Sequence, residues 1–496
     1  MFFGMVGPVG SNLGAVCRAL SKELNDAGYE TLEIKVSDLI RVLFSHEEIP
    51  REEDKRINKL MDLGNELRKK TERGDILALV SVGKITELRE QKTKDSKEPA
   101  RKTAYILNQL KRPDEVRALR AIYGKLFFLI AAYLPKEKRV ENLSKSISRS
   151  YTKPAGNEKH IEAAKYLVSR DEKEEGEDFG QDVSRAFPEA DLFISTESEA
   201  VITEGIIRFI DILFSNPFHT PTQEEMGMYF ARSAALRSAD LSRQVGAAIV
   251  TSEGDVVSIG CNEVPKARGG QYWPSDKKDD RRDFKEGHDS SATSKAEILS
   301  ELINAVQPLG IFRDGLDAEA ITKTLTEGHG KNILKGTQIQ NLLEFGRPVH
   351  AEMAAITTAA RLGLSIRNTT LYSTTFPCHM CARHIISSGI TRVVYVEPYP
   401  KSRVMELYKD SVEVDVAKAD PNKLNFQPFV GVSPSRYLEF FEMGALKRKE
   451  DSGLVIKWER KRSNPRVQRL VLTYMWLEDK IIKFLGALLK EKGLRG

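Results

Sequence analysis

Cysteine is scarce in this 496-residue chain, which has four, at positions 17, 261, 378 and 381. Cys17 and Cys261 lie far apart and in different predicted domains, so a disulfide framework is not expected. The sequence instead predicts a reducing, cytoplasmic location. Long apolar runs are missing as well, and no stretch is predicted to span a bilayer. The opening residues MFFGMVG lack the basic residues and the length of a signal peptide, so secretion is not indicated.

A strong net charge is also lacking, since the chain carries +5 overall. The charge is uneven, because residues 447–496 hold 14 Lys and Arg against 6 Asp and Glu. Apolar residues at helical spacing in this basic tail predict a helix that docks on another domain or a partner subunit. Its basic residues suit RNA, DNA or phospholipid, although a solvated helix face is the commoner outcome.

Two short motifs in the second half suit metal-assisted chemistry: HAE at 350–352 and PCHMC at 377–381. A catalytic zinc keeps one coordination position open, so three protein ligands are expected rather than four. His350 supplies an imidazole, and Cys378 and Cys381 supply two sulfurs from one helical turn. Glu352, two positions after the histidine, is then a non-ligating acid placed to move protons.

Each motif is predicted to open a helix. Residues 351–362 read as a helix ended by Gly363, and a strand at 371–374 leads through Pro377 into a helix that stops at Gly389. Two helix N-termini would meet at one ion, and their positive ends favour thiolates. A structural zinc, or two unrelated cysteines with a core histidine, is the alternative, which the added H-x-E and the prolines disfavour.

Residues from about 230 to 437 resemble the zinc-dependent cytidine and deoxycytidylate deaminases. The segments SRQVGAAIV (242–250) and VVSIGCN (256–262) resemble that family's opening β-hairpin, whose final asparagine contacts the substrate sugar. The resemblance therefore assigns substrate binding to Asn262, with an ordinary turn residue as the alternative. Cys261 is expected to be a small buried residue rather than a fourth ligand.

Segments 395–405 and 426–437 resemble the carboxyl-terminal part of deoxycytidylate-type enzymes, which favours free nucleotides over nucleic acid. In the first of them, Lys401, Ser402 or Arg403 would meet a phosphate, unless these are solvated loop residues.

A long insertion at 265–348 separates the hairpin from the first zinc motif. Its segment GGQYW at 269–273 offers aromatic rings that would cover a base by stacking. The sequence Gly287-His288-Asp289 predicts a solvated turn in preference to a second metal site.

The chain opens with a strand at 1–6, a glycine-rich turn and a helix from Leu13, followed by a strand at 32–36. This βαβ pattern resembles a P-loop, with Gly7, Gly10, Ser11 and Asn12 as candidate nucleotide-binding residues. Ser11 stands where the lysine belongs, so phosphoryl transfer is not expected. Backbone amides still suit phosphate binding, and a purely structural turn is the alternative.

The remainder of the first half resembles a nucleotide kinase, with buried strands at 104–110, 126–130 and 190–194. A charged region around Arg139, Arg170 and Asp171 resembles a kinase lid, in which each charge is expected to be solvated or capping. Residues 172–182 are expected to form mobile surface.

The predicted fold class is α/β, with a P-loop NTPase-like three-layer α/β/α domain followed by a cytidine-deaminase-like α/β/α domain. A degenerate kinase-like, regulatory domain is assigned to residues 1–216 and a zinc-dependent deoxycytidylate-type deaminase domain to 222–446. The basic helical tail follows at 447–496. The two prolines in 216–221 mark the linker.

This order of domains resembles the bacterial phage-defence deoxycytidine nucleotide deaminases. The resemblance implies Zn²⁺-dependent conversion of dCTP and dCMP to their uracil forms, which depletes dCTP during infection. It also implies a nucleotide effector at the first domain, an inhibitory small RNA and a homo-oligomer. Two alternatives are open: a base deaminase acting on RNA or single-stranded DNA, and a nucleotide-binding switch with residual kinase activity.

Overall fold

The computed structural model describes residues 1–95, 98–151, 158–172, 174, 177–309, 317–326, 334, 337, 339, 342, 344–397, 402–415, 420–444, 446–466 and 473–494. The chain divides into two compact units, Met1–Glu225 with Val430–Gly496, and Met226–Phe429. The sequence assigns residues 430–446 to the second domain, whereas the structure groups them with the first unit. The physical reason is strand β12 (Gly431–Val432), which pairs with a strand of that unit's sheet.

The first unit is built on a six-stranded sheet in the order β12-β5-β4-β1-β3-β2. All strands but β12 run parallel. Those parallel strands are β1 (Phe2–Val6), β2 (Glu30–Lys35), β3 (Thr103–Leu110), β4 (Phe127–Tyr133) and β5 (Leu192–Ser195). The central strands β1 and β4 are apolar and buried, as expected for a sheet covered on both faces.

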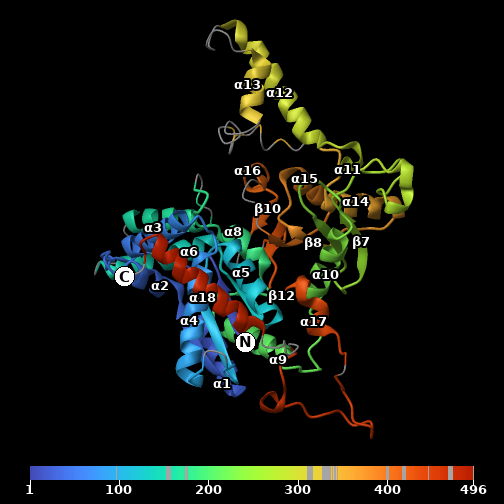
Figure 1. Cartoon of the computed structure of the whole chain (residues 1–496). Helices are drawn as coiled ribbons and strands as arrows, with labels where there is room; N and C mark the ends of the chain where they lie inside the picture. Colours follow the sequence, from blue (N-terminus) through green and yellow to red (C-terminus); the bar gives the residue numbers. More distant parts are fainter. Residues whose placement is uncertain are drawn as a thin grey trace. The chain divides into compact units, whose positions relative to one another are not determined.

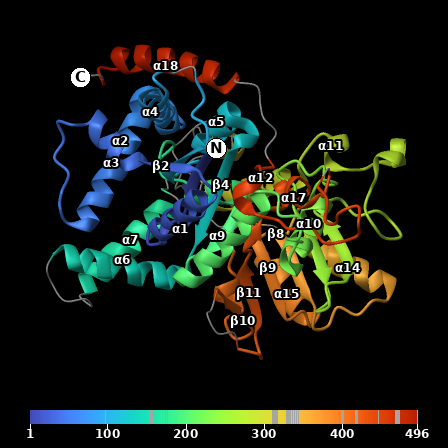
Figure 2. The same ribbon diagram turned by 90° about the horizontal axis from the view of Figure 1, so that it is seen from below.

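Helices cover both faces of this sheet, which confirms the prediction of three layers. Helices α1 (Leu13–Asp26) and α9 (Glu199–Leu213) pack together on one face, and α4 (Ile76–Thr93) and α5 (Pro113–Tyr123) lie on the other (Figure 2). The remaining longer helices of the unit are α2 (Val36–Leu43), α3 (Glu53–Thr71), α6 (Lys136–Ser150), α7 (Glu158–Glu172) and α18 (Thr473–Glu491). Short helices α8 (Val183–Ala186) and α17 (Tyr437–Phe441) complete it.

The carboxyl-terminal helix α18 packs against α4. Glu478 of α18 is fully buried, pairs with Arg89 of α4 at 2.5 Å, and accepts a hydrogen bond from the Tyr123 hydroxyl at 2.8 Å. The predicted docking of the tail on another part of the chain is therefore confirmed for α18.

The predicted lid residues are buried rather than solvated. Asp171 is fully buried; its carboxylate accepts the Val9 N–H at 2.7 Å and pairs with Lys111 at 2.7 Å. The Arg170 guanidinium, also largely buried, pairs with Asp62 at 2.6 Å. A buried carboxylate needs such partners. Both its burial and its partners come from tertiary contacts, which the local sequence does not reveal.

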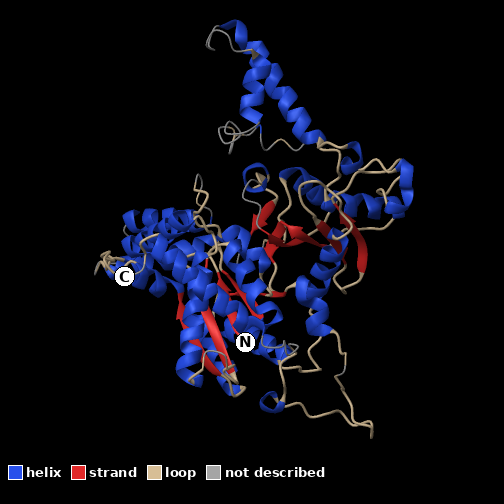
Figure 3. Ribbon diagram, viewed as in Figure 1, coloured by secondary structure: helices blue, strands red, loops and turns tan. Residues whose placement is uncertain are grey.

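The second unit has a mixed six-stranded sheet in the order β10-β11-β9-β8-β6-β7. Strand β6 runs antiparallel to both neighbours, and the other pairs are parallel. The strands are β6 (Gly246–Val250), β7 (Val256–Cys261), β8 (Thr370–Thr375), β9 (Arg392–Glu397), β10 (Val412–Val414) and β11 (Leu424–Pro428). In both units the helices flank the strands (Figure 3).

Two glycines allow helices to approach the second sheet closely. A Cβ on Gly246 would lie 1.9 Å from the Ala231 carbonyl oxygen of α10 (Gln223–Ala235). A Cβ on Gly260 would lie 2.4 Å from the Ala351 carbonyl oxygen of α14 (Ala351–Leu362). Since Gly246 and Gly260 stand on opposite faces of the β6–β7 hairpin, α10 and α14 cover opposite faces of the sheet. Helix α15 (His379–Ser387) shares the apolar core of α14.

The longest elements in the described part of the 265–348 insertion are helices. It contains α11 (Asp283–Glu286), α12 (Ser290–Val306) and α13 (Ala318–Thr326), and α12 and α13 pack as a pair (Figure 1). Their contact buries Leu299, Ile303 and Ala318. A further short helix of the unit, α16 (Val404–Leu407), follows β9. No helix among the described residues is both long and apolar enough to cross a membrane.

Candidate zinc centre

Both predicted motifs lie at helix N-termini, as their prolines and glycines indicate. His350 is the N-cap of α14, which ends at Gly363 in the left-handed conformation (φ 71°). Cys378 is the N-cap of α15, and its sulfur accepts the Cys381 N–H at 3.4 Å. Both N-caps have extended backbone, which directs their side chains across the helix ends. The sequence prediction of two convergent helix starts is confirmed.

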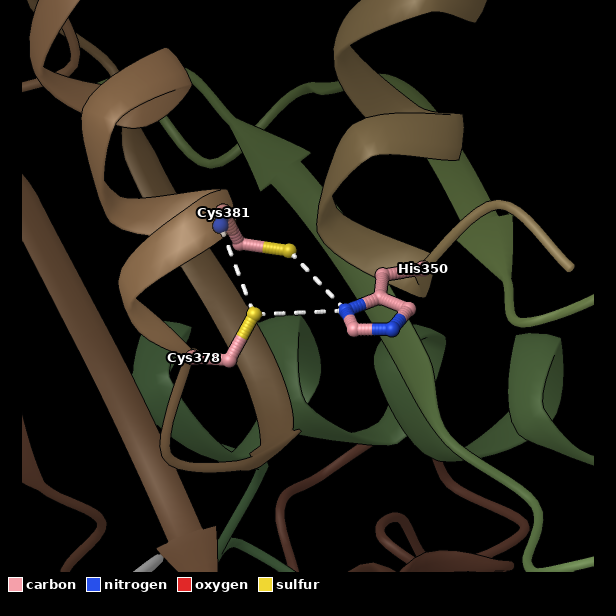
Figure 4. Close-up of side chains that lie close together, drawn as sticks. All are labelled: His350, Cys378 and Cys381. Carbon is pink, nitrogen blue, oxygen red and sulfur yellow. Dashed lines mark hydrogen bonds between the residues drawn. The ribbon is translucent and has the colours of Figure 1, made fainter. Parts of the chain in front are cut away.

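The three predicted ligands face one another (Figure 4). The His350 Nδ1 atom lies 3.3 Å from the Cys378 sulfur and 3.4 Å from the Cys381 sulfur. All three donor atoms lie within 4.8 Å of one another, and the two cysteines are buried. Among the described residues this is the one such group of His, Cys, Asp and Glu.

These distances fit zinc. Tetrahedral geometry with ordinary Zn–N and Zn–S bonds separates a ring nitrogen from a sulfur by about 3.5 Å. Three soft or borderline donors with no fourth side chain match a catalytic site rather than a closed structural one. Cys261 is not part of the group; its thiol lies 3.3 Å from the Gln271 side-chain oxygen, and burial raises its pKa to about 11.

Protons shared among the donors also fit a cation site. The Cys381 thiol and the His350 ring lower the pKa of Cys378, which favours its thiolate form. Hydrogen bonding to that sulfur raises the pKa of His350 to about 9, and the same sulfur together with burial raises the pKa of Cys381. A divalent cation replaces such protons when it binds, because thiolate and neutral imidazole are the ligating forms.

Glu352 lies in the first turn of α14, beside the His-Cys-Cys group. It is 3% exposed, and burial raises the pKa of its carboxyl group above the usual value. Its two oxygens accept hydrogen bonds from the Ser373 hydroxyl and the Cys381 thiol, each at 3.4 Å. A buried carboxyl group with a raised pKa is suited to exchanging protons near neutral pH.

A cavity of about 430 Å³ opens at this centre. Its described lining comes mainly from the zinc motifs, the loop before β6 and the insertion, and Asn262 after β7 adds to it. The lining includes His350, Glu352, Arg243, Asp283 and Lys295.

Asn262, at the end of β7, lines this cavity and also holds its wall. Its Oδ1 accepts the Val245 N–H at 2.7 Å and its Nδ2 donates to the Arg243 carbonyl at 2.8 Å. The side chain is 7% exposed. The predicted sugar contact stays a prediction, but the structure shows that this asparagine fixes the loop at 243–245 beside the zinc ligands.

Of the residues predicted to meet a phosphate, Ser402 and Arg403 are not among the described residues that line the cavity. Arg403 pairs with Glu406, the Ser402 hydroxyl donates to the Pro377 carbonyl at 3.0 Å, and Lys401 lies outside the described residues. The aromatic segment of the insertion is also elsewhere, because the Trp273 ring stacks under Arg237 at 3.7 Å. Sequence reasoning instead missed Arg243, on the loop that Asn262 holds, and Lys295, whose place in the cavity depends on how the insertion folds back.

The glycine-rich loop of the first unit lies at a different cavity, of about 850 Å³. Asn12 caps α1, with its Oδ1 accepting the Ala15 N–H at 3.2 Å, and Gly10 has φ 89°. The Gly7 carbonyl accepts a hydrogen bond from Gln109, and the Ser11 hydroxyl is buried without a hydrogen-bond partner. The carboxylate of Asp171 accepts the Val9 N–H, so this backbone amide of the loop is already hydrogen-bonded within the chain.

Comparisons with known proteins agree with the site. Residues 221–397 match the model of the cytidine and deoxycytidylate deaminase zinc-binding region. This part of the chain is therefore a deaminase domain of the cytidine and deoxycytidylate type, and its His-Cys-Cys group fits Zn²⁺.

Particular relatives are deoxycytidylate deaminases. The chain is 43% identical over 83 residues to the deoxycytidylate deaminase of Enterobacteria phage T4, covering 16% of this chain and 43% of that protein. It is 28% identical over 218 residues to a probable deoxycytidylate deaminase of Drosophila melanogaster, covering 42% of this chain and 80% of that one. The chain thus spans less than half the length of the phage T4 relative.

A solved structure of dCMP deaminase from the cyanophage S-TIM5 also aligns with the chain. The alignment covers 42% of this chain and 99% of that one, with 15% identity and a TM-score of 0.22.

Proposed function

We propose that this protein is a zinc-dependent hydrolase that deaminates deoxycytidine nucleotides, converting dCMP, dCTP or both to the uracil nucleotide and ammonia. The observation that carries the proposal is the convergence of His350, Cys378 and Cys381 with a buried carboxyl group, Glu352, in contact with the ligand sulfur. The similarity of the region to deoxycytidylate deaminases supports the choice of substrate class.

His350 Nδ1 and the sulfurs of Cys378 and Cys381 would hold the metal. Bound zinc supplies Lewis acidity, which makes a water molecule acidic enough to attack at neutral pH. Glu352 takes a proton from the attacking water and passes it to N3 of the cytosine ring. Glu352 then takes the remaining proton from the new hydroxyl group at C4 and gives it to the exocyclic amine, so that ammonia leaves as the C4 carbonyl of uracil forms.

The surroundings of Glu352 suit both steps. Its raised pKa lets the same group accept a proton and then donate it near neutral pH. The Ser373 hydroxyl orients one of its oxygens, and Asn262 holds the neighbouring loop.

A panel of substrates tests this function. Pure protein with about one zinc per chain is incubated with dCMP, dCTP, CTP and a cytosine-containing oligonucleotide, and uracil products are followed by chromatography. We expect conversion of dCMP, dCTP or both. Conversion confined to the oligonucleotide would instead support a nucleic-acid base deaminase. The basic residues of the tail favour that alternative, because they suit binding to a nucleic acid.

In this proposal the first unit is regulatory and binds a nucleotide effector. Its large cavity is lined by seven Lys and Arg side chains against three Asp and Glu, so it suits an anion such as a nucleoside phosphate. Phosphoryl transfer is not expected there, because Ser11 stands where a P-loop has its lysine. Depletion of dCTP against phage, restraint by a small RNA and assembly as a homo-oligomer belong to the same proposal and are supported by resemblance alone.

Effector binding has its own test, by calorimetry with dNTPs on a Glu352→Gln variant, which would report binding without turnover. A Gly10→Val substitution should abolish the part of the heat that arises in the first unit, because a Cβ at Gly10 would lie 2.5 Å from the Arg139 carbonyl oxygen. Identical titrations of both proteins would contradict an effector site at this loop.

A further inference from the structure

The cavity at the zinc centre has a wall that the deaminase motifs do not supply. Asp283, Asp289, Ser291 and Lys295 of the insertion line it, together with residues 346 and 348 at the insertion's end. An insertion that reaches the reacting end of a substrate cavity is in a position to select the substrate.

This wall is tied firmly to the metal ligand. The Arg347 guanidinium pairs with Asp283 at 2.8 Å and donates to the Arg281 carbonyl at 2.9 Å. The Ser290 hydroxyl donates to the Phe345 carbonyl and accepts the Arg347 N–H, both at 3.2 Å. Three residues after Arg347 the chain reaches His350, so the first turn of α12 is positioned relative to the zinc donors by a short, hydrogen-bonded connection.

The face of α12 that points into the cavity continues the face that forms the core of the insertion. Ser291 and Lys295 line the cavity, and Leu299 and Ile303, each four residues further on, are buried against α13. Residues four apart share a helix face. Packing at Leu299 and Ile303 therefore fixes the rotation of α12 that directs Lys295 toward the substrate cavity.

Three of the four described Asp and Glu side chains that line the cavity hold its walls. Asp240 accepts the Ser242 N–H at 2.8 Å, Asp289 accepts the Ser291 N–H at 2.9 Å, and Asp283 pairs with Arg347. Among the described lining residues, the Lys and Arg side chains are Arg243, on the loop before β6, and Lys295. These two cations come from different walls of one cavity.

We propose that the insertion completes the substrate site and that Lys295, together with Arg243, binds the phosphate of the nucleotide. This inference rests on the proposed deaminase function and deepens it, because it assigns the choice of a nucleotide over a nucleoside to one residue of the insertion. The phosphate is a compact dianion, which an ammonium group and a guanidinium group from two walls recognise together.

The test compares dCMP with deoxycytidine, which has the same base and sugar but no phosphate. Lys295→Met keeps the length of the side chain and removes its charge. We expect kcat/KM for dCMP to fall by about 10- to 100-fold, mainly through KM, as for loss of a charge-assisted contact. The value for deoxycytidine should stay within about twofold, and Lys295→Arg should retain most activity on dCMP. Lys323→Met, at an exposed position of α13, is the matched control and should leave kcat/KM unchanged for both substrates.

A parallel loss on dCMP and deoxycytidine, or an unchanged value for dCMP, would overturn the role of Lys295. If deoxycytidine turnover is below detection, the inhibition constants of dUMP and deoxyuridine provide the same comparison. A wild-type protein that deaminates no cytosine nucleotide would refute the proposed function instead. In that case dUMP binding, measured by calorimetry on the wild type and on Lys295→Met, still decides whether Lys295 holds the phosphate, because equal affinities would refute it.

Discussion

A methyl group added at Gly260 on β7 should greatly reduce deamination at the zinc centre, although Gly260 is not one of the zinc ligands. In a Gly260→Ala variant the new Cβ would lie 2.4 Å from both the Ala351 carbonyl oxygen and the Ala355 nitrogen, and 2.8 Å from the Ala354 Cβ. Comfortable contact requires about 3.5 Å, so strand and helix must separate by about 1 Å. The opposing atoms are mostly backbone, which has no rotamer in which to escape.

The displaced turn of α14 is the one that carries His350 and Glu352. A misplacement of about 1 Å in catalytic groups costs about 100-fold in rate, and overpacking costs about 1–3 kcal/mol of stability. We therefore expect kcat on dCMP to fall by about 100-fold, with a lower melting temperature and a weaker hold on zinc.

The assay measures dCMP deamination, zinc content by elemental analysis and thermal unfolding on one preparation. Gly83→Ala, in helix α4, is the matched control, because the nearest atom to its new Cβ is 4.0 Å away and alanine favours a helix. The control should be fully active and at least as stable. Full activity and unchanged melting in Gly260→Ala would refute the close packing of β7 on α14.

Three further predictions follow from single contacts. Cys378→Ser should lose zinc, with elemental analysis falling from about one ion per chain to near zero, and retained metal would contradict its role as a ligand. Asn262→Ala removes two hydrogen bonds that hold residues 243–245, so KM for dCMP should rise by about tenfold at unchanged zinc content, and an unaltered KM would argue against that function. Glu478→Ala removes the buried carboxylate that pairs with Arg89 and should destabilise the protein by about 3–5 kcal/mol in denaturant unfolding, whereas Glu491→Ala at the exposed end of α18 should change little.

The zinc motifs and their elements were predictable because their determinants are local. A helix from 351 ends at Gly363, and the helix after Pro377 ends before Gly389 at φ 78°, as the glycines indicate. Metal-ligand spacing is likewise a short-range pattern, so the sequence alone brings His350, Cys378 and Cys381 together.

Features that depend on distant contacts were not predictable. Asp171 is predicted to be a solvated or capping charge, yet it is buried because Val9 and Lys111, more than 50 residues away in sequence, provide its partners. The grouping of residues 430–446 with the first unit has a similar cause, since β12 pairs with β5 across more than 200 residues. The place of Lys295 in the cavity was not predicted from the sequence, because it depends on the Arg347–Asp283 pair that folds the insertion back.

Comparison of wild type with Glu352→Gln tests the central claim most directly. Both proteins are brought to equal zinc content, and uracil nucleotide formed from dCMP is measured by chromatography. Glutamine keeps the size of the side chain but cannot carry the proton, so we expect a loss of at least about 1,000-fold with zinc and melting temperature retained. A Glu352→Gln variant that deaminates dCMP at the wild-type rate would contradict the account.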